Sequence, residues 1–181
     1  MNAPGPAIVL LTGIQAAGKS TVAQALAERL PRSVHVRGDV FRRMVIGGRE
    51  EMSAEPSQEA VRQLRLRLQL TARTADAYFD AGFTAVVQDV LLGEHLAETV
   101  AQIRNRPLLV VVLAPTPEAV AEREAGRGKN AYDHWAVQQL DAVLREQTPR
   151  IGLWLDTSDQ TPEQTVDEIL RRAWTEASVE I

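Results

Sequence analysis

The sequence contains no cysteine among its 181 residues, which excludes disulfide bonds, thiolate metal sites and cysteine nucleophiles. Aromatic residues make up only 4% of the chain, so aliphatic side chains should dominate the core. No apolar run approaches the length of a membrane span, and residues 1–6 lack the basic start of a signal peptide. The net charge of −4 argues against broad binding of nucleic acid. These absences predict a cytoplasmic protein that contacts neither membrane nor nucleic acid.

Short apolar runs alternate with longer helical patterns along the whole chain. The runs at residues 7–11, 33–37, 83–88, 108–113 and 151–155 predict five strands. Between them, periodic apolar residues predict helices, including a short helix at 40–44 and a last helix opened by a capping box at 161–164. This alternation is typical of βαβ units. We therefore expect one doubly wound three-layer α/β domain over residues 1–181, with ligands at the carboxyl ends of parallel strands.

A glycine-rich stretch follows the first predicted strand and fits the pattern G-x-x-x-x-G-K-[ST] at every fixed position. Its glycines let successive backbone N–H groups turn toward one anion. The lysine adds a charge for the β- and γ-phosphates, the serine hydroxyl can ligate Mg²⁺, and the following helix contributes its dipole. The sequence thus predicts a nucleotide-phosphate site made of Gly13, Ile14, Gln15, Ala16, Ala17, Gly18, Lys19, Ser20 and Thr21.

One long segment, residues 57–81, has two competing patterns. Leucines at alternate positions suit a strand, whereas the residue types and one continuous apolar stripe favour a helix that Gly82 closes. We expect the helix. A second stripe through Leu66 and Leu70 then needs cover from a substrate or from another copy in a homo-oligomer. The arginines of this helix are interpreted as its solvated face: Arg62, Arg65, Arg67 and Arg73.

Two aspartates follow the second and third predicted strands, where the carboxyl ends of parallel strands meet one crevice. A kinase needs a carboxylate that orients the acceptor hydroxyl and accepts its proton. We assign Asp39 as this base and give Asp89 a part in binding magnesium or the acceptor, while the reverse assignment stays open. The neighbouring Arg42 and Arg43 could grip an acceptor. The alternative for each aspartate is a helix N-cap.

A second basic group lies within a predicted lid at about residues 124–132. Arg127 stands between two glycines, and Arg123 precedes it on the same helix. A mobile arginine that closes over the transferred phosphoryl group would stabilise its charge and exclude water. The alternative is a solvated basic helix end. Arg123 could instead bind the nucleotide, with its side chain against the adenine. The three histidines lack the spacing of a zinc site.

Together these segments resemble P-loop small-molecule kinases such as nucleoside and shikimate kinases, and within that group chloramphenicol phosphotransferase. The resemblance covers about residues 7–170 and rests on the glycine-rich loop, on Gly38-Asp39, on residues 88–92 and on the two arginines of the lid. It implies strand order 2-3-1-4-5, ATP with Mg²⁺ as the donor, and transfer to a hydroxyl of a small molecule such as an antibiotic. It places the proton acceptor on Asp39, acceptor binding in the helical region at about residues 40–80, and adenine contacts on Thr157 and Ser158.

Two other functions remain open at this point. The arginine-rich long helix, with Arg42 and Arg43, would also suit a polynucleotide 5′-hydroxyl kinase. The polar loop at residues 47–56 and the second apolar stripe would suit a nucleotide-dependent regulatory module without a phosphoryl acceptor. The sequence does not distinguish ATP from GTP as the donor.

Overall fold

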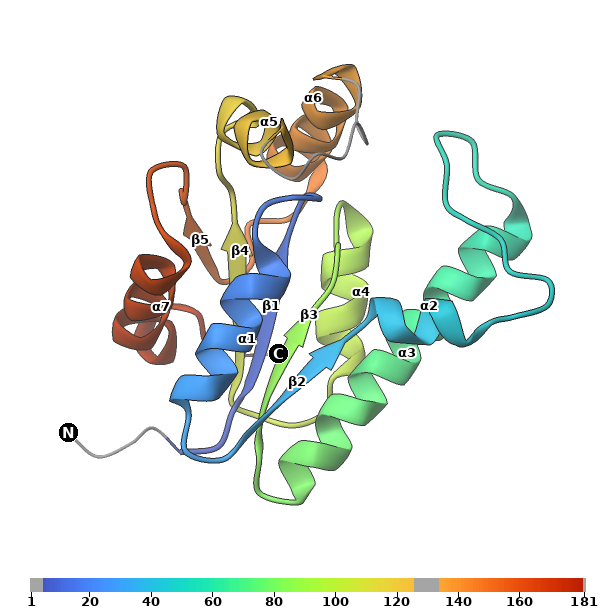
Figure 1. Cartoon of the computed structure of the whole chain (residues 1–181). Helices are drawn as coiled ribbons and strands as arrows, with labels where there is room; N and C mark the ends of the chain where they lie inside the picture. Colours follow the sequence, from blue (N-terminus) through green and yellow to red (C-terminus); the bar gives the residue numbers. More distant parts are fainter. Residues whose placement is uncertain (1–4, 126–133, 181) are drawn as a thin grey trace.

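A parallel five-stranded sheet in the order β2-β3-β1-β4-β5 forms the centre of the computed structural model (Figure 1), which describes residues 5–125 and 134–180. The central strands β1 and β4 are buried at every residue, because helices cover both faces of the sheet. Ile8 of β1 pairs with Ala85 on one side and Leu108 on the other. The strands are β1 Ile8–Gly13, β2 Ser33–Arg37, β3 Thr84–Gln88, β4 Leu108–Leu113 and β5 Leu153–Leu155.

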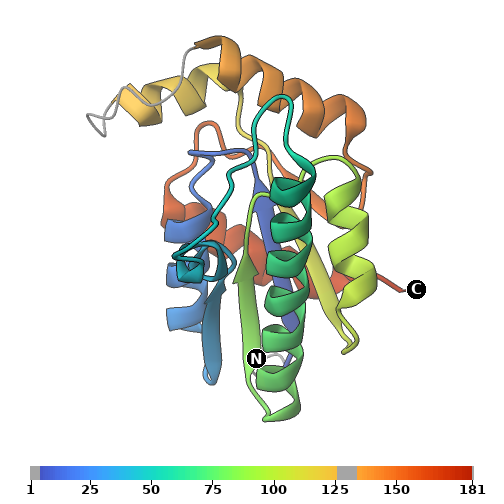
Figure 2. The same cartoon turned by 90° about the vertical axis from the view of Figure 1, so that its right-hand side faces the viewer.

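Helices lie on both sides of the sheet and across its upper edge. Helices α1 and α7 contact each other on one face, and α3 and α4 cover the other. Helices α5 and α6 cross the edge at which the strands end (Figure 2). The helices are α1 Lys19–Arg29, α2 Asp39–Met44, α3 Gln58–Asp80, α4 Glu94–Gln102, α5 Pro117–Ala125, α6 His134–Ala142 with a π-helical continuation η1 Val143–Gln147, and α7 Pro162–Glu176.

The predicted architecture is confirmed in its class and in its strand order. The ambiguous segment at 57–81 is a helix, capped by the Ser57 hydroxyl, which accepts a hydrogen bond from the Ala60 N–H. The capping box at Thr161 and Gln164 is also present. The sequence pattern did not indicate the π-helical turn after α6.

Several boundaries differ from the prediction by one or two residues, and two of the differences have identifiable reasons. Strand β5 begins two residues later than expected, because Gly152 adopts a φ of +74° where an added Cβ would lie 2.2 Å from the carbonyl oxygen of Val110. The backbone therefore turns at Gly152 before it can pair. Helix α2 begins one residue earlier than expected, at Asp39, with Gly38 as its N-cap. Asp39 is thus inside the first turn and does not cap the helix.

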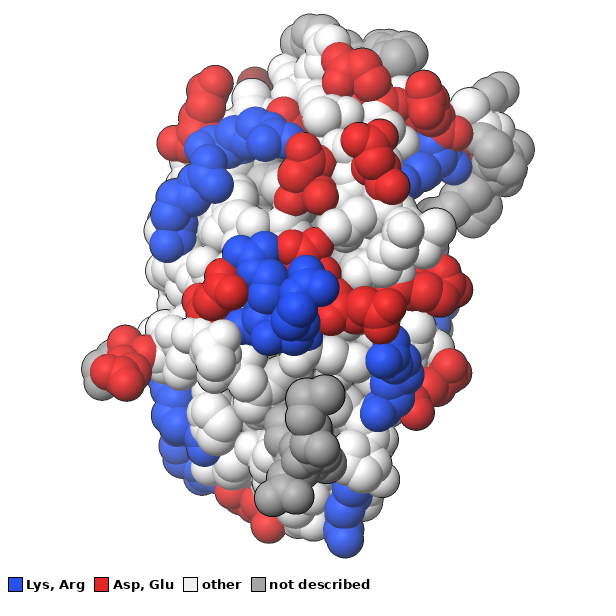
Figure 3. Space-filling view, turned by 90° about the vertical axis from the view of Figure 1, so that its left-hand side faces the viewer, with Lys and Arg blue, Asp and Glu red and all other residues white. Residues whose placement is uncertain are grey.

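Charges of both signs are interspersed on the side of the molecule that carries α7 (Figure 3). Arg29 pairs with Asp167, and Arg172 pairs with both Glu168 and Glu176. This face therefore consists of local ion pairs and not of a continuous basic surface for a polyanion. In the part of the chain that the structure describes, no helix is both long enough and apolar enough to span a bilayer.

Candidate active site

The loop between β1 and α1 adopts a backbone that only small residues fit. Gly13 has a φ of +151°, and an added Cβ would stand 2.5 Å from the carbonyl oxygen of Leu113. Ala16 and Gly18 also have positive φ, at 59° and 93°. Gly18 is the N-cap of α1 and supplies no side-chain cap, so the first N–H groups of the helix remain for an anion. Gln15, Ser20 and Thr21 are exposed around this concave backbone.

Lys19 is folded into the loop that precedes it. Its ammonium group donates a hydrogen bond of 2.6 Å to the carbonyl oxygen of Ile14, and the residue is buried. Burial lowers the pKa of Lys19 from 10.5 to about 8, while the Asp89 carboxylate acts in the opposite direction. A bound phosphate group would supply the negative charge that this buried lysine favours.

Asp89, at the end of β3, is held in a buried ion pair. The Arg67 guanidinium of α3 donates from Nε at 2.9 Å and from Nη2 to the two carboxylate oxygens. The side chains are only 3% exposed for Asp89 and 15% for Arg67. Burial raises the pKa of Asp89 above its ordinary value, and the Arg67 guanidinium and the Val90 N–H oppose this rise. Both oxygens of Asp89 are therefore engaged by this chain itself.

Asp39 stands at the end of the neighbouring strand and is partly accessible. Arg43, one helical turn later, donates to its Oδ2, and the Nε of Arg37 lies 3.7 Å from Oδ1. Partial burial would raise the pKa of Asp39, but the guanidinium groups of Arg43, Arg37 and Arg67 outweigh it and hold the pKa below its ordinary value. The Oδ1 oxygen is buried and accepts no hydrogen bond from the described residues. Asp39 is thus an ionised carboxylate at this end of the sheet, and its buried Oδ1 oxygen lies beside Arg37 without a hydrogen bond from the described residues.

The remaining predicted residues on the acceptor side are paired with carboxylates. Arg42 donates to Glu51 at 2.5 Å, and Arg43 is occupied by Asp39. Apart from Tyr78, the exposed large apolar residues of the described chain come from α2 and the loop after it, from the middle of α3 and from the turn after β3. They are Val40, Met44, Ile46, Met52, Leu66 and Val90.

Arg123 ties the phosphate-binding loop to the loop after β5. Its guanidinium donates to the backbone carbonyl oxygens of Thr157 and Ser158, and more distantly, at 3.5 Å, to that of Ala17. The Ser158 hydroxyl accepts a hydrogen bond from the Thr116 N–H at 2.9 Å. The structure therefore brings the three predicted nucleotide residues together beside the loop. Arg127 and most of the predicted lid lie outside the described residues.

Arg67 is the site residue that sequence reasoning missed, because it was interpreted as part of a solvated helix face. The structure corrects this interpretation. Arg67 follows the buried Ala60 by seven residues and precedes the buried Thr71 by four, so it shares their face of α3. A single cation within an apolar stripe was the signal that could have revealed it.

Neither aspartate is a helix N-cap, since glycines occupy that position in both α2 and α4.

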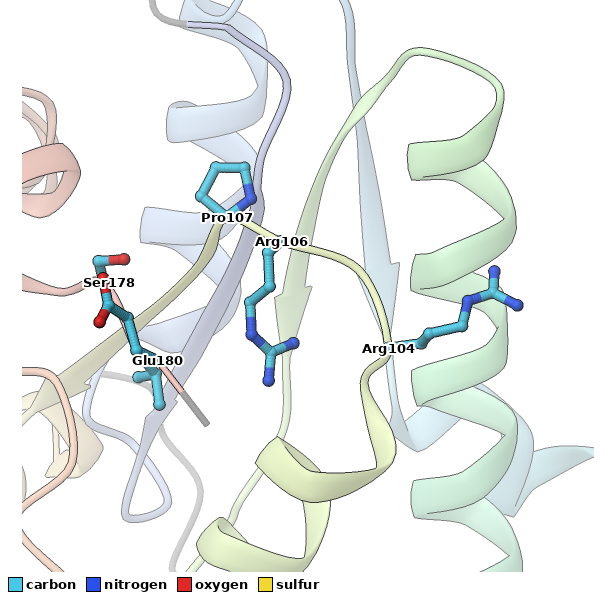
Figure 4. A pocket seen from close by; sticks show the side chains of 6 residues that line it. Arg104, Arg106, Pro107, Ser178 and Glu180 are labelled. Carbon is cyan, nitrogen blue, oxygen red and sulfur yellow. The ribbon is translucent and has the colours of Figure 1, made fainter.

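An open hollow of about 720 Å³ lies at the opposite edge of the sheet, where Arg106 and Pro107 lead into β4 (Figure 4). Arg104 also lines the hollow, and its side chain extends toward α3, where the guanidinium donates to Asp80 at 2.6 Å. Arg106 donates to the carbonyl oxygens of Ile103 and Asn105, both at 2.9 Å. Both arginines therefore form hydrogen bonds within the chain. The hollow is remote from the phosphate-binding loop.

The sheet order, the loop between β1 and α1, and the aspartates at the ends of β2 and β3 define a P-loop kinase fold. The chain matches the model of the AAA domain family over residues 8–149 and belongs to that family. The resemblance to small-molecule P-loop kinases is thereby confirmed at the level of family and fold.

Similar proteins agree with this placement. A UPF0200 protein of Aeropyrum pernix is 31% identical over 142 residues, covering 77% of this chain and 75% of the relative. A sugar kinase from a Janibacter species superposes with a TM-score of 0.68 at 20% identity, covering 92% of this chain and 93% of the kinase. The tunicamycin resistance protein of Deinococcus radiodurans also gives 0.68, at 21% identity, and covers 96% and 99%. The APS kinase of Mycobacterium tuberculosis gives 0.66 at 19% identity and covers 93% and 97%.

Proposed function

We propose that this protein is an ATP-dependent phosphotransferase that transfers the γ-phosphoryl group to a hydroxyl of a small organic molecule, such as an antibiotic or another natural product. The observation that carries the proposal is the pairing of an intact phosphate-binding loop with Asp39 at the same end of the sheet, where one carboxylate oxygen accepts no hydrogen bond from the described residues. In the reaction, the acceptor oxygen bonds to the γ-phosphorus and the bond to the β,γ-bridging oxygen breaks. ADP leaves, and the hydroxyl proton passes to Asp39.

The choice of Asp39 over Asp89 as the proton acceptor follows from their partners. Both oxygens of Asp89 accept from Arg67, so Asp89 would have to break a buried ion pair before it could bind a hydroxyl. Asp39 keeps one oxygen without a hydrogen bond from the described residues. Its lowered pKa makes it a weak base, which suits a loose transition state in which the proton leaves late. Its main contribution would be orientation of the acceptor hydroxyl.

The donor site also fits a magnesium ion with one protein ligand. Ser20 is exposed in the first turn of α1, next to Lys19, and its hydroxyl can serve as that ligand. Magnesium keeps several waters and binds phosphate oxygens, so a second protein ligand is not required. We therefore assign Ser20 as the magnesium ligand and Asp89 as the ion-pair partner of Arg67. The ion would neutralise charge on the β- and γ-phosphates.

The surroundings of Asp39 favour an uncharged acceptor over a polynucleotide. The arginines on this side have carboxylate partners, since Arg42 and Arg49 share Glu51 and Arg65 lies 3.7 Å from Glu98. Polynucleotide binding depends on cations that remain available to phosphates. The exposed apolar side chains near Asp39, including Met44 and Val90, offer contact area to a partly apolar alcohol instead.

The test is incubation of the protein with ATP and Mg²⁺ and a panel of hydroxylated antibiotics, natural products, sugars and a 5′-hydroxyl oligonucleotide. Mass spectrometry should detect the gain of one phosphoryl group on a small molecule. Asp39→Asn should lower kcat by about a hundredfold or more, with the KM for ATP changed by no more than about twofold. The matched control is Asp80→Asn, an exposed carboxylate at the far edge of the sheet, which should leave turnover unchanged.

Each alternative outcome has a distinct meaning. Transfer to the oligonucleotide alone would replace the proposal with polynucleotide kinase activity. ATP binding without transfer to any acceptor, together with a partner protein retained only in one nucleotide state, would indicate a regulatory module. Full turnover by Asp39→Asn on an active acceptor would refute the assignment of the base while leaving the kinase activity intact.

A further inference from the structure

The Arg67–Asp89 ion pair lies at the meeting point of three elements. Arg67 comes from the middle of α3, Asp89 from the end of β3, and Gly38 from the turn between β2 and α2. The N–H of Gly38 donates at 3.0 Å to the carbonyl oxygen of Gln88, the residue before Asp89. The pair therefore sits where the strand ends of β2 and β3 are joined.

The carboxylate of Asp89 packs directly against the backbone of Gly38. A Cβ added to Gly38 would stand 1.9 Å from Oδ2 and 2.6 Å from Cγ of Asp89, closer than nonbonded atoms approach. Arg67 fixes this carboxylate with two hydrogen bonds, so its position is set by α3. Gly38 is also the N-cap of α2, so this contact lies at the start of that helix, one residue before Asp39.

Arg67 also influences the groups around it by its charge. It is one of three arginines that hold the pKa of Asp39 down, the others being Arg43 of α2 and Arg37 of β2. His35 of β2 is the other titratable group that interacts with Asp39, and burial and the charge of Arg37 lower its pKa. Arg43 and Arg37 are more exposed than Arg67, so water screens their charges more strongly.

We propose that Arg67 is a positioning residue of the phosphoryl-transfer site, which places Asp39 by holding Asp89 against Gly38. The role of Asp39 in this statement rests on the proposed function. The placement and the ionisation can be measured on the free protein, so a failure here and a failure of the kinase proposal are separable.

The experiment is carbon-detected NMR titration of the aspartate carboxyl groups in the full chain, for the wild type and for Arg67→Gln. The Asp39 midpoint should move to higher pH in Arg67→Gln, because one opposing positive charge is removed. The amide signals of Gly38 and Asp39 should shift as well, because the carboxylate behind them is released. Arg73→Gln is the matched control, since Arg73 is exposed on the same helix. Arg73→Gln should change neither the Asp39 midpoint nor the two amide signals.

Two further variants separate positioning from stability. Arg67→Gln leaves Asp89 buried without its cation, so Arg67→Gln/Asp89→Asn is measured in parallel because it removes both buried charges and should remain folded. The rise in the Asp39 midpoint should be smaller here than in Arg67→Gln, because the negative charge of Asp89 is removed together with the positive charge of Arg67. Arg67→Lys keeps the charge but loses the two-point contact, so the midpoint should stay near the wild-type value while the Gly38 amide still shifts.

On any acceptor found active, Arg67→Gln/Asp89→Asn should reduce kcat at least about tenfold, with the KM for ATP changed by no more than about twofold. An unmoved Asp39 midpoint in folded Arg67→Gln would overturn the charge contribution. Unmoved Gly38 and Asp39 amides in Arg67→Gln and Arg67→Lys would overturn the positioning role. Neither result would affect the proposed kinase activity, which the acceptor panel tests separately.

Discussion

Gly38→Ala is the most direct probe of how the candidate base is placed. The backbone at Gly38 has φ −60° and ψ −33°, a conformation that alanine adopts readily. At such a position, replacing glycine ordinarily stabilises a protein by about 0.4–1 kcal/mol, because the unfolded chain loses freedom. Any destabilisation must therefore come from the new methyl group itself.

The structure sets the size of that effect. The methyl carbon would lie 1.9 Å from Oδ2 of Asp89, so either α2 or the Arg67–Asp89 pair has to move. Overpacking of this kind costs about 1–3 kcal/mol, and disruption of a buried ion pair costs about 3–5 kcal/mol. We expect a net loss of about 2 kcal/mol after the backbone gain, which lowers Tm by about 4–8 °C for a chain of this length.

Urea and thermal unfolding measure this loss, and the matched control is Gly47→Ala. Gly47 also lacks a positive φ, but an added Cβ would meet no atom within 4 Å, so stability should stay level or rise slightly. In an Asp89→Ala background the methyl group has room, and the cost of Gly38→Ala should fall by at least about 1 kcal/mol. An equal cost in both backgrounds, or a stable Gly38→Ala, would refute the close contact.

Three further predictions follow from other parts of the molecule. Lys19 has a lowered pKa of about 8, so between about pH 8 and pH 10.5 the unfolded chain binds more protons than the folded protein. The free energy of unfolding should therefore rise by about 3 kcal/mol across that window relative to Lys19→Met. A pH-independent difference between the two proteins would contradict the burial of the ammonium group. Arg123→Ala removes the bonds to the Thr157 carbonyl oxygen, so the KM for ATP should rise about tenfold in steady-state assays, and an unchanged KM would separate this loop from the nucleotide. Gly152→Ala would place a Cβ 2.2 Å from the Val110 oxygen at a residue with a φ of +74°. In urea unfolding, the free energy of unfolding should fall by at least about 2 kcal/mol, while turnover per folded molecule stays unchanged. Wild-type stability in this variant would contradict the turn at Gly152.

Much of the fold could be predicted because its determinants are local. The apolar runs of β1 and β4 and the glycines around Lys19 depend on neighbours within a few residues. The start of β5 could not be predicted, because it depends on the approach of Gly152 to Val110, which is 42 positions away. The π-helical turn at 143–147 likewise has no local pattern that distinguishes it from a continued α-helix.

The candidate site also has some features with local determinants and others that depend on long-range contacts. The phosphate-binding loop and the two aspartates were found from spacing, since parallel strands bring their carboxyl ends to one edge. Spacing did not reveal that the two aspartates have different hydrogen-bond partners, because Arg67 and Asp89 are separated by 22 positions of sequence. Asp39 remains the predicted base, and the structure supports that choice by the partners it gives each carboxylate.

The sequence by itself determined that a nucleotide-phosphate loop sits on a parallel sheet, because backbone geometry and apolar periodicity are encoded over short spans. Only the tertiary structure decided that an arginine engages both oxygens of Asp89, whereas Asp39 keeps one oxygen without a hydrogen bond from the described residues. That difference arises from burial and from the direction of one side chain on α3, and both exist only once the helix has packed against the sheet.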